Sequence, residues 1–197
     1  MNKQSERRIE KSTKRIALSI LTEGFATLEE GLTIFDEVAR NKLSIVTEGH
    51  NVKYIERAMQ LAGIAGASLV EGLEDVTGKS QLKTLFDFFH RVNHEKNVLF
   101  VWDCDANYQL TEANNTHYFF LPKNTGNALA SKGIENMFDE GLFNDYKKTI
   151  TNSLGLTKTE FDETRKRDFE KFILQRNCAE DFRNFESLCS RIRALTA

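Results

Sequence analysis

Four short apolar runs alternate along the chain with segments in which apolar residues recur every three or four positions. The runs cover residues 43–47, 67–70, 97–102 and 117–121. The third run, Asn97–Trp102, is apolar without alternation, which is typical of a strand covered on both faces. Helical periodicity over 52–62 and 78–94 separates the first three runs. This order predicts right-handed crossovers and an α/β fold in which helices sandwich a mainly parallel, Rossmann-like sheet of four strands.

Further helical patterns lie on both sides of the predicted sheet. They cover residues 3–22 and about 27–38 before it, and roughly 133–149, 158–176 and 180–195 after it. We therefore expect one α/β domain with helical extensions. Residues 1–40 are expected to form an N-terminal helical segment suited to docking a partner, and residues 41–125 the core. Residues 126–197 are expected to form a C-terminal helical region that completes the domain.

Acidic residues follow two of the predicted strands at the point where each strand ends. Glu48 comes directly after the first run, and Asp103 and Asp105 come after the third. Parallel sheets bind ligands beyond the carboxyl ends of their strands, and alternation predicts that both aspartates leave on one side. If the two strands are neighbours, three carboxylates converge, and a hard divalent cation such as Mg²⁺ or Mn²⁺ offsets their repulsion. The alternative is that these acids cap the next helix or face solvent.

The same residues carry a resemblance to a known fold. Ile45–Gly49, followed two βα units later by Leu99–Asp105, resembles the Toprim domain over roughly residues 40–125. The resemblance implies that Glu48 acts as a general acid/base or metal ligand and that the Asp-x-Asp pair binds the metal. Val52 is a departure, because many Toprim proteins carry a further acid at this position.

Residues after the predicted sheet resemble those of OLD-family (overcoming lysogenization defect) nucleases. Lys132–Phe138 is similar to the Ile-Glu-Asn segment of that family, which implies that Glu135 helps to hold a second metal ion. The family also carries a lysine in the helical region that follows, and the resemblance implies that Lys166 has this catalytic role. The alternative for Glu135 is an acid in the first turn of a helix, where the helix dipole favours it.

Two other segments match known motifs less well. Val70–Asp75 contains a Glu-Gly-x-x-Asp pattern that begins at Glu71, but only one predicted helix separates it from Asp103, whereas Toprim sheets place two βα units between their motifs. Thr77–Ser80 is similar to the end of a P-loop, yet Leu73 stands where the earlier glycine is required. We expect neither segment to form the active centre.

Composition indicates the cellular setting more than the chemistry. A net charge of −2 is not that of a protein that coats nucleic acid, although an acidic metal centre offsets surrounding Lys and Arg. Three cysteines without metal-ligand spacing are typical of free thiols in a reducing compartment. The sequence shows no membrane-span pattern and no secretory signal, so we expect a cytoplasmic protein.

The expected function is divalent-metal-dependent hydrolysis of phosphodiester bonds in DNA or RNA. The OLD resemblance implies a role in anti-phage defence with a separate ATPase subunit, and it is compatible with a homo-oligomer. The alternative is a non-catalytic Toprim module that serves as a scaffold in a nucleic-acid-processing complex. Stoichiometric binding of a divalent metal near Glu48 separates the two functions.

Overall fold

A parallel sheet forms the centre of the protein. The computed structural model describes residues 42–70 and 78–197. Its four-stranded sheet has the order β2-β1-β3-β4, and each neighbouring pair is parallel. The strands are β1 (Leu43–Thr47), β2 (Ala67–Leu69), β3 (Asn97–Trp102) and β4 (Thr116–Phe120). The predicted α/β class and the parallel sheet are therefore confirmed.

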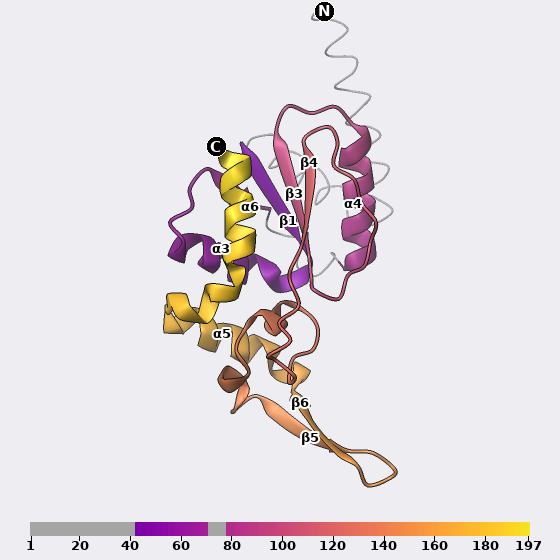
Figure 1. Cartoon of the computed structure of the whole chain (residues 1–197), viewed down its shortest axis with the longest axis vertical. Helices are drawn as coiled ribbons and strands as arrows, with labels where there is room; N and C mark the ends of the chain where they lie inside the picture. Colours follow the sequence, from indigo (N-terminus) through magenta and orange to yellow (C-terminus); the bar gives the residue numbers. More distant parts are fainter. Residues whose placement is uncertain (1–41, 71–77) are drawn as a thin grey trace, which may run out of the picture.

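Helices cover both faces of this sheet, because successive side chains of each buried strand point to opposite sides. The covering helices are α3 (Val52–Leu61), α4 (Lys79–Arg91) and α6 (Glu186–Thr196). On one face, Ile45 and Leu99 belong to the core that includes α3 and α6. On the other face, Phe100 and Trp102 pack with α4 (Figure 1). The two central strands are thus buried on both sides, as the apolar run at Asn97–Trp102 predicted for β3.

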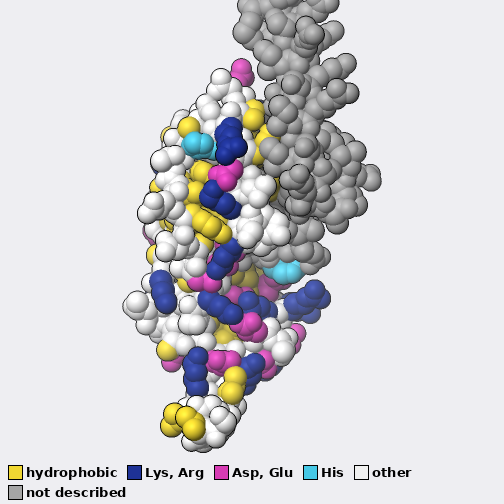
Figure 2. Space-filling model, turned by 90° about the vertical axis from the view of Figure 1, so that its right-hand side faces the viewer, with side chains coloured by type: hydrophobic (Ala, Val, Ile, Leu, Met, Phe, Trp, Pro, Cys, Tyr) yellow, Lys and Arg dark blue, Asp and Glu magenta, His cyan; other side chains and the backbone are white. Residues whose placement is uncertain are grey.

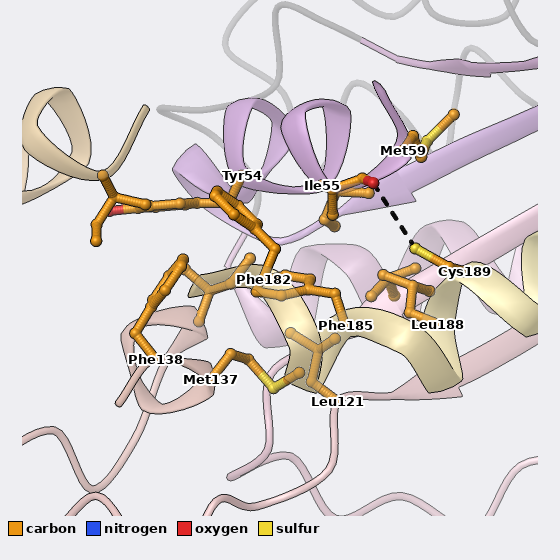
Figure 3. Packing of buried hydrophobic residues seen from close by; sticks show 14 of the residues in the cluster. Tyr54, Ile55, Met59, Leu121, Met137, Phe138, Phe182, Phe185, Leu188 and Cys189 are labelled. Atoms are coloured by element: carbon orange, nitrogen blue, oxygen red, sulfur yellow. Dashed lines mark hydrogen bonds between the residues drawn. The ribbon is translucent and has the colours of Figure 1, made fainter. Parts of the chain in front are cut away.

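The helices α3 and α6 meet over the first of these faces. Figure 3 shows Ile55 and Met59 of α3 opposite Leu188 and Cys189 of α6. The Cys189 thiol lies 4.0 Å from the carbonyl oxygen of Ala58. The last helix of the chain therefore shares a core with the helix that directly follows β1.

The region after the sheet differs from the predicted run of helices. Residues 133–149 form two 3-10 turns and then enter a strand, so the helix predicted there is wrong. Residues 158–161 belong to a second strand, so the helix predicted over 158–176 begins too early. The elements are η2 (Ile134–Met137), η3 (Glu140–Phe143), β5 (Lys147–Thr151), β6 (Thr157–Phe161), η4 (Glu163–Arg165), α5 (Lys166–Arg176) and η5 (Ala179–Phe185), followed by α6.

Local chemistry explains both differences. Ile134, Met137 and Phe138 have helical spacing and are buried, but they reach the core from a single short turn. The strands β5 and β6 are rich in threonine, whose branched side chain favours strands, and they pair as an antiparallel hairpin with Thr149 opposite Thr159. Apolar spacing alone therefore did not identify the elements of this region.

Some predictions lie on residues that the structure does not describe. They are the N-terminal docking segment at 1–40 with its helices over 3–22 and 27–38, and the alternative acidic motif at Glu71. In the described ranges, no helix is long and apolar enough to cross a membrane.

An ion-pair network connects the loop before β4 to α6. Glu112 lies 2.9 Å from Nδ1 of His117 and also pairs with Arg191. Partial burial raises the pKa of Glu112, but the hydrogen bonds from His117 and Arg191 outweigh it, so the pKa is lower than its ordinary value. The stabilising effect of this carboxylate is therefore complete above the pKa of the unfolded chain and disappears as the pH falls through the lower pKa of the folded protein.

We expect Glu112→Gln to lower the free energy of unfolding by about 0.5–1 kcal/mol at pH 7, because the network is partly exposed to solvent. Urea unfolding at pH 7 and at pH 3 measures the difference from the wild type. The difference is expected to shrink at pH 3, and an equal loss at both pH values contradicts the prediction. The matched control is Glu56→Gln, which changes an exposed acid of α3.

Candidate functional site

The buried carboxyl group of Glu48 and the half-buried one of Asp103 lie close together at the carboxyl edge of the sheet. The strands β1 and β3 are neighbours, with Thr47 opposite Val101, so the residues after them leave the sheet together. Glu48 is 7% exposed, and its Oε1 accepts a hydrogen bond of 3.0 Å from the backbone N–H of Asp103. The structure therefore brings Glu48 and Asp103 together, as the strand order required.

Asn51 orients this pair. Gly49 has a φ of +42°, and with it the chain turns sharply after β1 into the 3-10 turn η1 (Gly49–Asn51). The turn brings the buried Asn51 to the site, where its Nδ2 donates a hydrogen bond of 2.8 Å to Oδ1 of Asp103. Asn51 was not among the site residues predicted from the sequence, where its only signal is that of a polar residue in the turn after the first strand.

Burial disfavours the ionised form of both acids. Burial is the main cause of the raised pKa of Glu48, and the charge of Asp105 adds to it. Burial, and next the charge of Glu48, raise the pKa of Asp103 to about 7, although the hydrogen bond from Asn51 opposes the rise. Two adjacent buried carboxylates are costly when both are ionised, and a bound cation lowers that cost.

Asp105 pairs with a lysine and does not line the cleft. Its Oδ2 lies 2.5 Å from Nζ of Lys79, the first residue of α4. The backbone N–H of Ala106 bonds back to the carbonyl of Asp103, so the chain turns here and strand alternation no longer applies. Across the described ranges, no group of three or more His, Cys, Asp or Glu side chains is arranged to hold a metal ion. The expected convergence of three carboxylates is therefore reduced to two.

Glu135 and Lys166 reach the same region from the C-terminal part of the chain. Glu135 lies in η2 and is 6% exposed, and Lys166 is the first residue of α5. Nζ of Lys166 lies 3.6 Å from Oε2 of Glu135. Burial raises the pKa of Glu135, while the positive charge of Lys166 opposes the rise. This contact joins two residues that are 31 positions apart in the sequence.

A cleft of about 550 Å³ connects these groups. The acids that line it are the buried Glu48 and Glu135 and the half-buried Asp103, whereas Asp105 does not line it. Cations that are at least partly exposed stand around the acids, namely Lys53, Lys166, Arg167 and Lys171. Four of the five residues singled out from the sequence therefore face one cavity, with acids inside and cations toward solvent.

Tyr54 adds a hydroxyl group to the wall of the cleft. Its side chain is 2% exposed, and its Oη has no hydrogen-bond partner among the residues that the structure describes. Burial, followed by the charges of Glu135 and Glu170, raises its pKa, so the hydroxyl stays protonated and can donate. A buried donor without a partner costs free energy, and a ligand in the cleft can relieve that cost. The sequence analysis missed Tyr54 because helical spacing assigned α3 to the core alone.

Gly133 permits the position of Glu135. Its φ is +73°, and a Cβ at this residue would lie 2.7 Å from Oε2 of Glu135. We expect Gly133→Ala to lower the free energy of unfolding by about 1–2 kcal/mol through its backbone conformation, with a further loss from the displaced carboxylate.

The matched control for this prediction is Gly155→Ala. Gly155 has a φ of +76°, but no atom lies within 4 Å of the position that its Cβ would take. Chemical unfolding of both variants separates backbone strain from the clash with Glu135. Equal losses in the two variants contradict the prediction.

The donor atoms of the cleft are of the kind that a small, hard cation prefers. Glu48 and Asp103 are joined by the hydrogen bond from the backbone N–H of Asp103 to Oε1 of Glu48, and both carboxyl groups line the same cavity as Glu135. Oxygen donors suit Mg²⁺ and Mn²⁺ better than zinc. A divalent ion between these acids would also offset the negative charge that contributes to the raised pKa of Asp103.

Comparisons with protein-family models, with curated proteins and with solved structures found no significant match for this chain.

Proposed function

We propose that this cleft hydrolyses phosphodiester bonds of nucleic acid with Mg²⁺ or Mn²⁺. The observation that carries the proposal is the pairing of the buried Glu48 with the half-buried Asp103, which follow two adjacent parallel strands and line the same cleft. Acids held together in spite of a raised pKa are concentrated at functional sites, because their function outweighs their cost to stability. The Lys and Arg side chains around the floor suit an anionic polymer.

Glu48 and Asp103 are the proposed ligands of the catalytic ion, and Glu135 is the proposed ligand of a second ion. When bound, such an ion lowers the pKa of its water and offsets charge on the phosphate oxygens. Asn51 holds the Asp103 carboxylate in one orientation through its hydrogen bond. Asp105 acts through its charge, because Lys79 holds its carboxylate away from the cleft.

In the proposed reaction, the oxygen of a water molecule forms a bond to phosphorus while the bond between phosphorus and the leaving oxygen breaks. The carboxylate oxygen of Glu48 that would not bind the ion accepts the proton that the water loses. Lys166 stabilises the negative charge that develops on the phosphate and the leaving oxygen. The leaving oxygen takes up a proton from a solvent water molecule, the proton on Glu48 returns to solvent, and the products are an alcohol and a phosphate monoester.

Chain order supports a Toprim domain of the OLD type as the source of this site. The Toprim pattern places a glutamate after one strand and an Asp-x-Asp pair after another. Here Glu48 follows β1 and Asp103 follows the adjacent β3. We extend the proposal to a cytoplasmic nuclease that acts on DNA or RNA in anti-phage defence with a separate ATPase subunit. Val52 remains the departure from the Toprim pattern.

One observation favours a second function, that of a non-catalytic Toprim scaffold. The ion pair between Lys79 and Asp105 occupies a carboxylate that the Toprim pattern assigns to metal binding. A scaffold of this kind binds nucleic acid or partner proteins without cleaving them. Metal-dependent turnover distinguishes the two functions.

The test is cleavage of supercoiled plasmid, single-stranded DNA and RNA by the full chain with Mg²⁺ or Mn²⁺. We expect the wild type to cleave only when the metal is present. The cleavage rate of Glu48→Gln is expected to fall by at least about a hundred-fold, because losing a group that merely holds a metal ligand in place already costs about ten- to a hundred-fold. Glu56→Gln is the control, because Glu56 is exposed on α3 and does not line the cleft. Metal binding without cleavage of any substrate favours the scaffold, and equal activity in both variants excludes Glu48 as the centre.

A further inference from the structure

The β5–β6 hairpin carries exposed apolar side chains away from the body of the protein. In the described ranges, the exposed large hydrophobic residues are Ile150 at 44%, Leu154 at 82% and Leu156 at 66%. All three lie in or next to this hairpin, which projects from the lower end of the molecule (Figure 1). Exposed aliphatic residues gathered on one projecting element mark an interaction surface.

The tip of the hairpin is a defined turn. Oδ1 of Asn152 accepts hydrogen bonds from the backbone N–H groups of Leu154, at 3.0 Å, and Leu156, at 2.9 Å. The backbone N–H of Asn152 donates to the carbonyl of Leu156 at 2.9 Å, and Gly155 adopts a φ of +76° between the two leucines. The leucines are therefore presented to solvent by an ordered backbone, which lowers the entropy lost on binding.

The base of the hairpin is anchored in the core. Phe161 is 5% exposed, and its ring centroid lies 5.1 Å from that of Phe143. Its backbone N–H donates to the carbonyl of Leu129, and the next N–H, of Asp162, donates to that of Tyr146. A two-stranded ribbon is marginal alone, so these contacts fix the direction in which the arm projects.

The arm is positively charged in a chain of negative net charge. Residues 147–161 contain three lysines and one glutamate, whereas the whole chain has a net charge of −2. Its other exposed positions are mainly threonines, whose hydroxyl groups can donate to phosphate oxygens. Figure 2 shows Lys and Arg side chains, interspersed with Asp and Glu, above the apolar tip on the lower part of the molecule. The charge and the hydroxyl groups of the arm are thus complementary to a polyanion.

Cations connect the arm to the cleft. Glu163 lies between β6 and α5, and a hydrogen bond from Lys132 is the main cause of its lowered pKa. The charges of Lys166, in the cleft, and Lys148, on β5, lower it further. Lys148 also lies 3.6 Å from Asp162 at the base of the arm. Lys132, Lys148 and Lys166 thus offset the negative charge of Glu163 and Asp162 between the cleft and the arm. A polyanion in the cleft can therefore continue onto the arm without meeting an unpaired acid at these two positions.

We propose that the β5–β6 hairpin is an arm that grips double-stranded nucleic acid next to the cleft, with its lysines and threonines on the backbone and with Leu154 and Leu156 inserted between base pairs. The inference rests on the proposed function only in taking nucleic acid as the ligand. A two-stranded ribbon fits a groove of a duplex, and inserted aliphatic side chains unstack and kink the base steps that they enter. The arm would thereby bend the duplex toward the carboxylates of the cleft.

The size of the apolar surface favours this occupant over a protein. A stable protein interface buries about 800 Å² on each partner around an apolar centre. Two leucines and one isoleucine on a narrow ribbon, with Thr151, Asn152, Ser153 and Gly155 between them, offer no continuous apolar face of that kind. The same side chains suffice to enter one or two base steps.

The first test uses a duplex DNA with 2-aminopurine at successive positions, bound to the full chain in EDTA so that no metal-dependent cleavage occurs. We expect the wild type to raise 2-aminopurine fluorescence and Leu154→Ser/Leu156→Ser to abolish the rise while weakening binding about three- to ten-fold. Both leucines are exposed, so the variant is expected to keep the wild-type melting temperature. An equal rise in both proteins, or none in the wild type despite tight binding, overturns the inference.

The second test measures the salt dependence of duplex binding. Replacing Lys147 and Lys158 with alanine is expected to reduce the slope of log K against log salt concentration by about 2, one for each lysine that no longer neutralises a phosphate. Lys42→Ala is the control, because Lys42 lies before β1 at the opposite edge of the sheet, where it bonds to Thr196. An unchanged slope in the double variant overturns the inference.

The outcomes separate the arm from the nuclease. Metal-dependent cleavage that is normal in both arm variants, with no change in fluorescence or salt slope, leaves the proposed function intact and rejects the arm. Duplex unstacking that depends on the leucines, together with no cleavage, supports the arm and rejects the nuclease. A change from dimer to monomer in the leucine variant, with unaltered duplex binding, shows an interface between copies of the chain and rejects the arm.

Discussion

Asp103→Asn is expected to make the metal-free protein more stable at pH 8 and to remove the stabilisation that Mg²⁺ or Mn²⁺ gives the wild type. The pKa of Asp103 is raised from 3.8 to about 7, first by burial and next by the charge of Glu48. Protonated Asp103 therefore favours the folded state at low pH. This contribution is complete below about pH 4, the ordinary pKa of an unfolded chain, and is lost as the pH rises through the pKa of the folded protein.

At pH 8 the wild type carries the full cost of an ionised Asp103, whereas the neutral amide carries none. A pKa shift of this size corresponds to about 2–4 kcal/mol in favour of the variant, and the advantage is expected to shrink toward pH 4. The amide keeps the hydrogen bond because its oxygen can accept from Asn51. Saturating metal, at about a hundred times its dissociation constant, is expected to stabilise the wild type by about 2.7 kcal/mol and the variant by much less.

Chemical unfolding in EDTA and in Mg²⁺, at several pH values, measures both effects. The control is Asp87→Asn, which changes a carboxylate that is 40% exposed and paired with Lys83 on the other side of the sheet. A metal ligand is expected to give both effects, a more stable variant in EDTA and a loss of stabilisation by Mg²⁺. Replacing a merely structural aspartate would lower stability both in EDTA and in Mg²⁺. A variant that is less stable in EDTA at pH 8, or one that metal still stabilises fully, contradicts the prediction.

Phe138→Ala is expected to lower the free energy of unfolding by about 3–5 kcal/mol, the range for removal of a fully buried aromatic ring. Phe138 is completely buried, and its ring centroid lies 5.3 Å from both Tyr54 and Phe182. The ring thereby joins the wall of the cleft to the C-terminal helical region. It directly follows the turn that holds Glu135, so the substitution is expected to affect the site as well as the core.

Denaturant unfolding of Phe138→Ala and of Phe172→Ala tests this prediction. Phe172 is only partly buried on α5, so its loss is expected to be the smaller of the two. The less severe variant Phe138→Leu keeps much of the apolar volume and allows metal binding to be measured in a folded protein. Similar losses for Phe138→Ala and Phe172→Ala contradict the central position of Phe138 in the core.

Much of the sheet could be read directly from local patterns. Asn97–Trp102 is apolar at consecutive positions, and a strand buried on both faces explains such a short run. Alternation of strands with helices then required parallel neighbours. The meeting of Glu48 with Asp103 followed from that order, because parallel strands bring their carboxyl ends to the same edge.

The C-terminal region shows where local patterns fail. The spacing of Ile134, Met137 and Phe138 is that of a helix, yet these buried residues lie in and directly after one short 3-10 turn. The hairpin of β5 and β6 depends on a turn at Asn152–Gly155 and on the anchoring of Phe161. Tertiary packing of this kind overrides the helical spacing of single segments.

Short-range periodicity and the geometry of crossovers were enough to establish the parallel sheet, its layers and the edge at which Glu48 and Asp103 meet. The directions of individual side chains became known only from the packed fold. Lys79 draws Asp105 away from the pair, Asn51 holds Asp103, and Lys166 reaches Glu135. These contacts join residues that are far apart in the chain, and each depends on how helices and turns pack around the sheet rather than on any local pattern.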